Sequence, residues 1–163
     1  MNIVSMMPKL KEELRTIFND YGLKYVFDTN SQEIKVMKEK KPGEIFLIPF
    51  HSIADTLQRM IFYKAAIESN SESALVFEEP EAHSYPPFIS KVTHDIIQSD
   101  RNQFFITTHS PYVVNDFLEL PSDELAIYLV DFRNGETFVK RASDTEVQEM
   151  YEYGIELFFN TET

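Results

Sequence analysis

The sequence predicts an α/β fold in which short parallel strands alternate with helices. Two apolar runs, residues 74–77 and 104–107, have the pattern of strands buried on both faces, and a helical pattern over residues 86–99 separates them. Strands joined by a helix are typical of a parallel sheet with helices packed on it. The length of 163 residues fits one domain with one hydrophobic core.

The N-terminal part predicts a helix and a β-hairpin. The expected elements are a helix over residues 8–21 and hairpin strands over residues 25–27 and 34–36. Gly22 follows the helical pattern where a helix ends. The lysine-rich, Pro-Gly-containing stretch 38–43 is typical of a solvated linker. We therefore expect an accessory region over residues 1–43 and a main domain over residues 44–163.

The rest of the chain predicts further strands and helices. The expected elements are a strand over residues 45–48, helices over residues 54–68, 111–118 and 146–153, and a hairpin over residues 125–140. Asn134-Gly135 is a strong hairpin-turn signal, and Gly154 stands where the last helix ends. We expect this hairpin to extend the parallel sheet.

The charge, the absence of cysteine and the apolar runs of the sequence exclude several classes of protein. The chain has 15 basic and 27 acidic side chains and a net charge of −12, which disfavours direct binding of the whole chain to nucleic acid. Without cysteine it has no disulfide scaffold, no Cys-ligated zinc and no thiol nucleophile. No apolar run reaches the roughly 18 residues of a membrane helix, and no signal-peptide core opens the sequence. We expect a soluble, cytoplasmic protein without membrane contacts.

Two adjacent carboxylates follow the first buried strand. Glu78 and Glu79 come directly after the apolar run, at the carboxyl end of the strand, where open α/β sheets bind ligands. Because neighbouring side chains on a strand point opposite ways, we expect the two carboxylates to have different roles. One suits a cation such as Mg²⁺, and the other suits a water molecule that attacks the substrate.

A histidine follows the second buried strand. His109 lies 30 residues after Glu79, which leaves room for a crossover helix and a returning strand. The carboxyl ends of parallel strands meet at one edge of a sheet, so we expect His109 near the two glutamates. A histidine there is able to donate a hydrogen bond to a terminal phosphate.

Together these segments resemble two motifs of ABC-type ATPases. Residues 75–83 resemble the Walker B strand and D-loop, and residues 107–111 resemble the switch-histidine loop. The orders Glu-Glu-Pro-Glu-Ala-His and Thr-Thr-His-Ser-Pro-Tyr are most similar to the soluble branch that includes OLD-family and related anti-phage and DNA-repair AAA ATPases. The resemblance covers roughly residues 45–132.

This resemblance implies a fold and a set of roles. The implied fold is a partial P-loop NTPase sheet of ABC ATPase type with flanking helices and a β-hairpin. Glu78 takes the position of the Mg²⁺-associated carboxylate, Glu79 that of the catalytic glutamate, and His109 that of the histidine that contacts the γ-phosphate of ATP. The residues at D-loop positions, which face a partner subunit, are Pro80, Glu81, Ala82 and His83.

The family also has a signature motif at the start of a helix whose N-terminus faces the ATP of the other subunit. Residues 52–59 occupy that place, and the N–H and hydroxyl groups at a helix N-terminus attract phosphate. The glycines of the usual signature core are absent from this stretch. The residues assigned to nucleotide binding are Ser52, Thr56 and Arg59, with Asp55 beside them.

A phosphate-binding loop is missing from the sequence. None of the four glycines belongs to a Gly-x-x-x-x-Gly-Lys-Ser/Thr motif. We therefore expect the chain to be the C-terminal part of an ATPase domain and to be inactive alone. Its ATP and Mg²⁺ site would be completed by a Walker A half located upstream or in a partner chain. An incomplete sheet exposes apolar surface, so we expect a homodimer or other self-association.

Three functions stay open at this stage. The leading one is an ATPase coupled to a nucleic-acid or phage-defence process, with nucleic-acid contact indirect at most. A second is a stand-alone metal-dependent hydrolase or nuclease that uses Glu78, Glu79, Glu81 and His109 and needs no ATP. A third is a non-catalytic interaction module, for which Glu79→Gln would have no functional effect.

Overall fold

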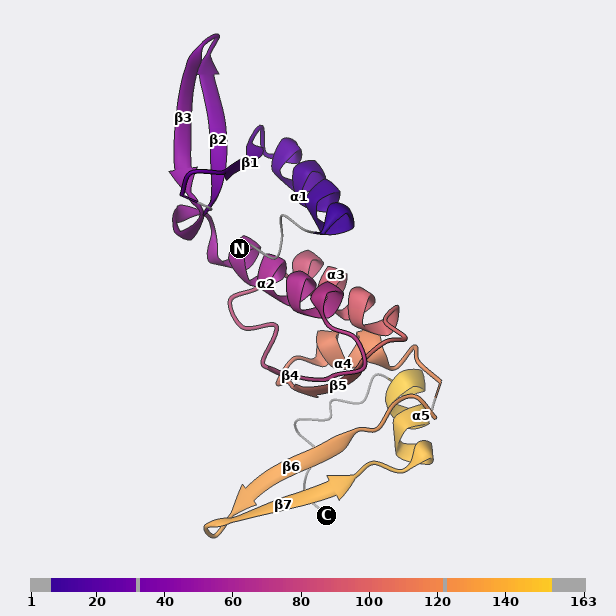
Figure 1. The fold of residues 1–163 in the computed structure, drawn as a ribbon. Helices are drawn as coiled ribbons and strands as arrows, with labels where there is room; N and C mark the ends of the chain where they lie inside the picture. Colours follow the sequence, from indigo (N-terminus) through magenta and orange to yellow (C-terminus); the bar gives the residue numbers. More distant parts are fainter. Residues whose placement is uncertain (1–6, 32, 122, 154–163) are drawn as a thin grey trace. The chain divides into compact units, whose positions relative to one another are not determined.

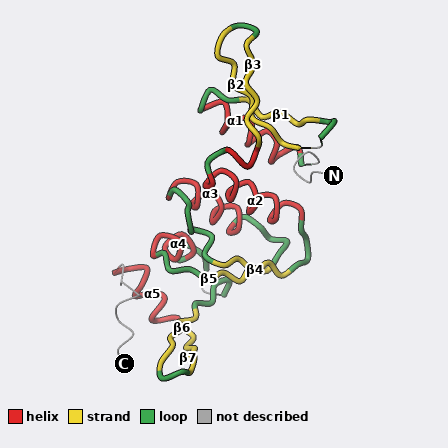
Figure 2. The backbone as a smooth tube through the Cα atoms, turned by 90° about the vertical axis from the view of Figure 1, so that its left-hand side faces the viewer, coloured by secondary structure: helices red, strands yellow, loops and turns green. Residues whose placement is uncertain are grey.

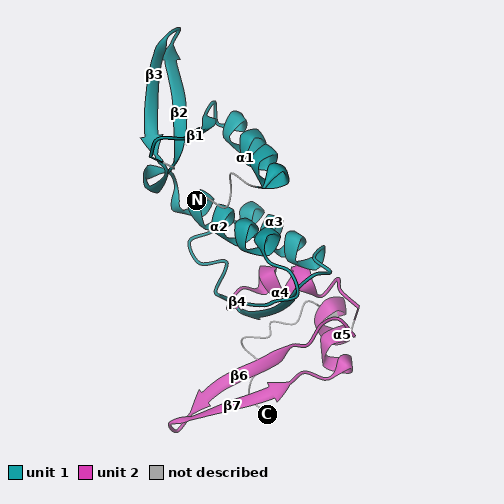
Figure 3. Cartoon of the chain, in the orientation of Figure 1, with its two compact units in different colours: residues 1–107 teal, residues 108–163 magenta. Residues whose placement is uncertain are grey.

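The computed structural model describes residues 7–31, 33–121 and 123–153 (Figure 1). The chain divides into two compact units, residues 1–107 and residues 108–163 (Figure 3). The division expected between residues 43 and 44 falls inside the first unit and stays a prediction.

The first unit opens with a helix and a three-stranded antiparallel sheet. These elements are α1 (Pro8–Asp20), β1 (Lys24–Asp28), β2 (Glu33–Lys41) and β3 (Glu44–Pro49), with the strands in the order β1-β2-β3. Helix α1 begins with a proline at its first helical position and buries the apolar stripe that predicted it: Leu10, Leu14, Ile17 and Phe18. The predicted helix and hairpin are thus confirmed.

The linker expected over residues 38–43 is wrong. These residues form the end of β2 and the tight turn into β3. Gly43 adopts φ +84° there, a left-handed conformation that glycine reaches without steric cost. The Pro-Gly signal therefore marks a hairpin turn, and the lysines lie on a paired strand.

The centre of the first unit is a βαβ arrangement. It consists of β4 (Ala74–Glu78), α3 (Pro86–Ile97) and β5 (Gln103–Thr107), and it follows a short 3₁₀ turn η2 (Phe50–Ser52) and helix α2 (Asp55–Ser69). Strands β4 and β5 pair in parallel with Glu78 opposite Thr107, as the sequence predicts. Helices α2 and α3 lie on the same side of this pair (Figures 1 and 2).

The parallel pair is buried on one face. Phe77 is 5 % exposed, and its ring packs against Tyr63 of α2 with the centroids 4.9 Å apart. On the other face Val76 is 72 % and Phe105 52 % exposed. The expectation that both faces are buried is wrong, because α2 and α3 lie on one side of the pair (Figures 1 and 2) and the side chains of the other face are exposed. An apolar run alone does not say how many faces are covered.

The second unit contains a hairpin and two helices around a small core. Its elements are α4 (Pro111–Phe117), β6 (Tyr128–Arg133), β7 (Glu136–Arg141) and α5 (Asp144–Tyr153), and Leu118, Ala142 and Met150 form the buried cluster. The turn at Asn134-Gly135 is confirmed, with both φ angles positive. The hairpin is a two-stranded sheet of its own, so its expected role as an extension of the parallel sheet is wrong.

Two expectations from the sequence concern the helices: where the last one ends, and whether any of them crosses a membrane. Gly154, the expected end of the last helix, lies outside the described residues. In the part of the chain that the structure describes, no helix has both the length and the apolar character needed to cross a membrane.

Candidate functional site

Strand β4 ends at the two predicted carboxylates. Glu78 is the last residue of the strand, and Glu79 follows it at φ +41°, a left-handed conformation that is uncommon outside glycine. The Glu79 N–H donates a 2.9 Å hydrogen bond to the Thr107 carbonyl at the end of β5. Both glutamates are exposed. The parallel pairing thus continues one residue beyond the strand and fixes the backbone of Glu79.

The residues after Glu79 form a compact turn. The Ala82 N–H donates to the Glu79 carbonyl and the Ser84 N–H to the Glu81 carbonyl, both at 2.9 Å. Pro80, within this turn, is fully buried. His83 is the second residue here with a positive φ, at +59°. Residues held in such conformations cluster at functional sites, and each costs on the order of 1–3 kcal/mol that the surrounding contacts must offset.

The first turns of α2 hold this turn in place. The Thr56 hydroxyl donates a 2.7 Å hydrogen bond to the carbonyl of His83. The Arg59 Nη2 donates to the carbonyl of Glu79 at 3.4 Å. Two of the predicted nucleotide-binding residues, Thr56 and Arg59, therefore donate hydrogen bonds to this turn. Helix α2 contacts both ends of the Glu79–His83 segment.

Arg59 lies between this turn and a cluster of aromatic rings. Its Nη2 also donates to the Tyr63 hydroxyl at 3.2 Å, and its guanidinium lies 5.9 Å from the centre of the Tyr63 ring. The Arg59 Nε is buried and lacks a hydrogen-bond partner among the described residues. A hollow of about 440 Å³ opens beside it, lined by Phe50, Gln58, Arg59, Phe62 and Tyr63. A buried N–H donor of this kind suits an acceptor from a molecule outside the described chain.

The remaining signature-region residues precede the helix. Ser52 is exposed and lies in η2, and Asp55 is the exposed first residue of α2. The N-cap position is Ala54, whose side chain makes no capping hydrogen bond. An N-terminus without a side-chain cap leaves main-chain N–H groups for another acceptor.

His109 belongs to the second unit, in the loop that leads from Thr107 into α4. It is exposed. The Ser110 N–H donates a 3.0 Å hydrogen bond to the Thr108 hydroxyl, which shapes the loop immediately before Pro111 starts the helix. Ser110 is the N-cap residue, and the proline at the first helical position is favourable for starting the helix.

Glu78 offers the kind of ligand that Mg²⁺ prefers. Mg²⁺ at nucleotide sites takes one or two protein carboxylates together with phosphate oxygens and water, so one exposed carboxylate at a strand end fits it. Over the described ranges, no three His, Asp or Glu side chains gather in a way that could hold a metal ion. The residues present therefore fit a metal that is held largely by phosphates.

Comparison with known protein families gives a match over residues 8–115 to the family described as "AAA domain, putative AbiEii toxin, Type IV TA system". The chain belongs to this AAA family. The matched range includes the α2 turns, the Glu79 turn and His109. No curated protein matches the AAA chain.

Solved structures share the fold of the AAA chain. One, from work on ATP-driven dimerization and DNA-stimulated activation of SMC ATPases, has 14 % identity and a TM-score of 0.57, and the match covers 91 % of this chain and 92 % of that one. Another, an SmcHead bound to the C-winged helix domain of ScpA, has 16 % identity and a TM-score of 0.57, with 86 % of this chain and 44 % of that one covered. The AAA chain thus has the α/β fold of an SMC ATPase head, of P-loop NTPase type.

Two parts of the site were absent from the sequence-based prediction. Tyr63 links Arg59 to Phe77, and the carbonyl of Thr107 receives the N–H of Glu79. Tyr63 follows Arg59 by one helical turn, a spacing that could have indicated their contact. No sequence signal marks a main-chain carbonyl.

Proposed function

We propose that this AAA chain carries the Walker B part of an ATP-hydrolysing site of ABC type. The observation that carries the proposal is the strained Glu79 at the end of a parallel strand, with its backbone held by Thr107 and Arg59. In this assignment Glu79 orients and polarises the attacking water. Glu78 would hold Mg²⁺, which neutralises phosphate charge when bound.

The other predicted residues take roles around this centre. His109 contacts the γ-phosphate, and the D-loop residues Pro80, Glu81, Ala82 and His83 face a partner subunit. Ser52, Thr56 and Arg59 act at the nucleotide of that partner. The uncapped start of α2 and the buried Nε of Arg59 support an anionic ligand on this side of the helix.

The proposed assembly is a dimer that closes around ATP, with a Walker A half supplied by another part of the protein or by another chain. ATP-driven dimerization of the structurally similar SMC ATPases supports this assembly. The family description as a putative toxin of a type IV toxin–antitoxin system supports a role linked to such a system, and we infer that this role belongs to phage defence or to another nucleic-acid process. The chain alone, which contains no Walker A motif, is proposed to be inactive.

The test is Mg-ATP turnover by the chain alone and by its complex with a chain that carries a Walker A motif, or by a longer protein that contains both. We expect turnover in the complex and none in the chain alone. Glu79→Gln lowers turnover by about 10²–10⁴-fold, the usual contribution of a general base. The matched control is Glu72→Gln, an exposed glutamate that precedes β4.

Two results would contradict the proposal. Unchanged turnover in the Glu79→Gln complex would remove the catalytic assignment. Turnover by the chain alone that is lost in both Glu79→Gln and His109→Ala would mean that phosphate is held without a separate Walker A half.

A further inference from the structure

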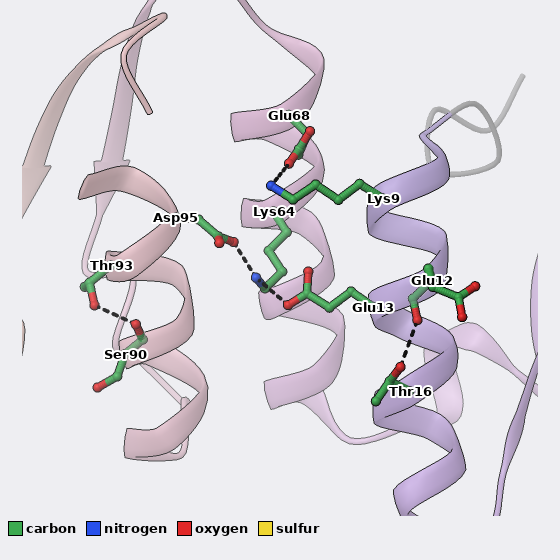
Figure 4. A network of polar contacts seen from close by, with 9 residues as sticks. All are labelled: Lys9, Glu12, Glu13, Thr16, Lys64, Glu68, Ser90, Thr93 and Asp95. Atoms are coloured by element: carbon green, nitrogen blue, oxygen red, sulfur yellow. Dashed lines mark hydrogen bonds and ion pairs between the residues drawn. The ribbon is translucent and has the colours of Figure 1, made fainter. Parts of the chain in front are cut away.

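A lysine is buried where three helices of the first unit meet. Lys64 of α2 is 1 % exposed and is the one charged side chain classed as buried among the described residues. Its Nζ lies 2.8 Å from a carboxylate oxygen of Glu13 in α1 and also pairs with the carboxylate of Asp95 in α3 (Figure 4). We refer to Glu13, Lys64 and Asp95 as the Lys64 triad.

The triad is better suited to orient helices than to strengthen their packing. Removing charges from water costs free energy that the ion pairs only partly regain, and apolar side chains of similar volume often stabilise a core equally well. An ion triad, unlike an apolar contact, fixes the axial position of each helix, because each carboxylate must meet one ammonium group. A second pair at the surface, Lys9 with Glu68 at 3.1 Å, joins α1 to α2 in the same register (Figure 4).

Helix α2 connects the triad to the turn after β4. Tyr63 precedes Lys64 in α2, and its ring packs against Phe77 of β4. The Tyr63 hydroxyl accepts a hydrogen bond from Arg59. Arg59 and Thr56, on the preceding turns of the same helix, donate to the carbonyls of Glu79 and His83. A shift or rotation of α2 against α1 and α3 would therefore change both hydrogen bonds to the turn.

We propose that Lys64 is a positioning residue that sets the geometry of the Glu79–His83 turn through α2 and ties that geometry to the docking of α1. The catalytic meaning of this coupling rests on the proposed ATPase function. The coupling itself concerns the backbone of the turn and needs no nucleotide. A polypeptide that displaces α1 would thereby alter the turn without touching it.

The experiment is amide hydrogen exchange of the full chain without nucleotide, followed at Ala82 and Ser84, whose N–H groups close the turn. In Lys64→Met we expect exchange at these two amides to become about tenfold faster through local opening. The matched control is Ile96→Ala, which removes a buried side chain from α3 and destabilises the unit without breaking the triad. It should accelerate core amides and leave Ala82 and Ser84 within about twofold.

Equal acceleration of the turn amides in Lys64→Met and Ile96→Ala would overturn the proposal, because it would reduce the triad to a contribution to overall stability. If Lys64→Met does not fold, Glu13→Gln removes one carboxylate charge and should give an acceleration of about threefold at the same amides. Unchanged exchange at these amides in Glu13→Gln would also overturn the proposal. An inactive ATPase would leave these exchange results unaffected, so the two proposals fail separately.

Discussion

The first unit holds two pairs of acidic residues, Glu13 with Asp95 and Glu78 with Glu79, and it holds them in opposite ways. Glu13 and Asp95 direct their carboxylates at the buried ammonium group of Lys64. Glu78 and Glu79 lie exposed at the end of β4, and the guanidinium of Arg59 donates to the main-chain carbonyl of Glu79. In the first pair the side chains are fixed, and in the second the contacts from α2 and β5 fix the main chain.

This difference separates a structural from a chemical use of acidic residues. Neutralising a carboxylate by a buried cation stabilises the carboxylate in one place and suits the joining of helices. Holding the peptide group instead sets where the side chain begins. Thr107 and Arg59 hold Glu79 in this second way, which is the arrangement that a general base needs.

The largest expected effect on stability comes from removing the cation of the buried pair. Lys64→Met leaves Glu13 and Asp95 close together at side-chain exposures of 35 % and 30 % without their ammonium partner. We expect the free energy of unfolding to fall by about 2–4 kcal/mol, somewhat below the cost of breaking a fully buried pair. Denaturant unfolding followed by circular dichroism measures it.

Lys9→Met is the matched control for that change. Lys9 also pairs with a glutamate across α1 and α2, but its side chain is 81 % exposed. The expected loss is about 0–1 kcal/mol, as for other surface ion pairs. Similar losses in the two variants would show that burial does not distinguish these ion pairs.

A smaller effect is expected from the contact that holds the far end of the turn. Thr56→Val keeps the shape of the side chain and removes the hydroxyl that donates to the His83 carbonyl at 2.7 Å. We expect a loss of about 1 kcal/mol, typical of one hydrogen bond. The same denaturant measurement tests it. A more stable variant would mean that this hydrogen bond does not offset the strain at His83.

The exposed pair should contribute least to stability. Glu79→Gln keeps the shape of the side chain and the main-chain contacts to Thr107 and Arg59, and it removes one of two adjacent negative charges. We expect the free energy of unfolding to stay within about 0.5 kcal/mol of the original value. Thermal unfolding of both proteins is the measurement. A loss comparable to that of Lys64→Met would make Glu79 a structural residue.

The sequence was sufficient for the elements and for the strand-end carboxylates. Alternation of apolar runs with helical patterns predicted β4, α3 and β5 in their parallel arrangement, since those patterns reflect local geometry. It overstated the burial of β4, because coverage of Val76 depends on strands and helices that the run itself does not specify. It mistook the Pro-Gly turn near Gly43 for a linker, because the same residues serve both structures.

The sequence likewise predicted only part of the candidate site. Glu79 was predicted by its place after a strand, but its left-handed backbone and its hydrogen bond to Thr107 arise from the pairing of two strands. No contact of Lys64 was predicted from the sequence. Yet Lys64 follows Leu57 by seven residues and Ile61 by three, and so lies on their apolar stripe. A lysine at such a position is a usable signal for a buried ion pair.

In the second unit, the carboxylate of Glu146 has a third use, in the cap of a helix. Glu146 accepts hydrogen bonds from Lys140 at 2.8 Å and from the N–H and hydroxyl of Ser143, and Ser143 in turn accepts the Glu146 N–H, as in a capping box at the start of α5. The hydrogen bond from Lys140, followed by those from Ser143, lowers the pKa of Glu146 from 4.5 to about 2. A lowered folded-state pKa stabilises the folded unit above the unfolded-state value, and this contribution is lost as the pH falls.

A pH-dependent contribution to stability is therefore expected at Glu146. The unfolding temperature of the original protein should exceed that of Glu146→Gln above pH 4.5, and the difference should shrink as the pH falls from 4.5 to about 2. Glu149→Gln, on the same helix and outside the cap, is the control. A difference between the original protein and Glu146→Gln that stays constant over this range would mean that the carboxylate charge does not contribute to the cap. Glu146 would then stabilise α5 through an interaction that does not depend on its ionisation and that glutamine does not reproduce.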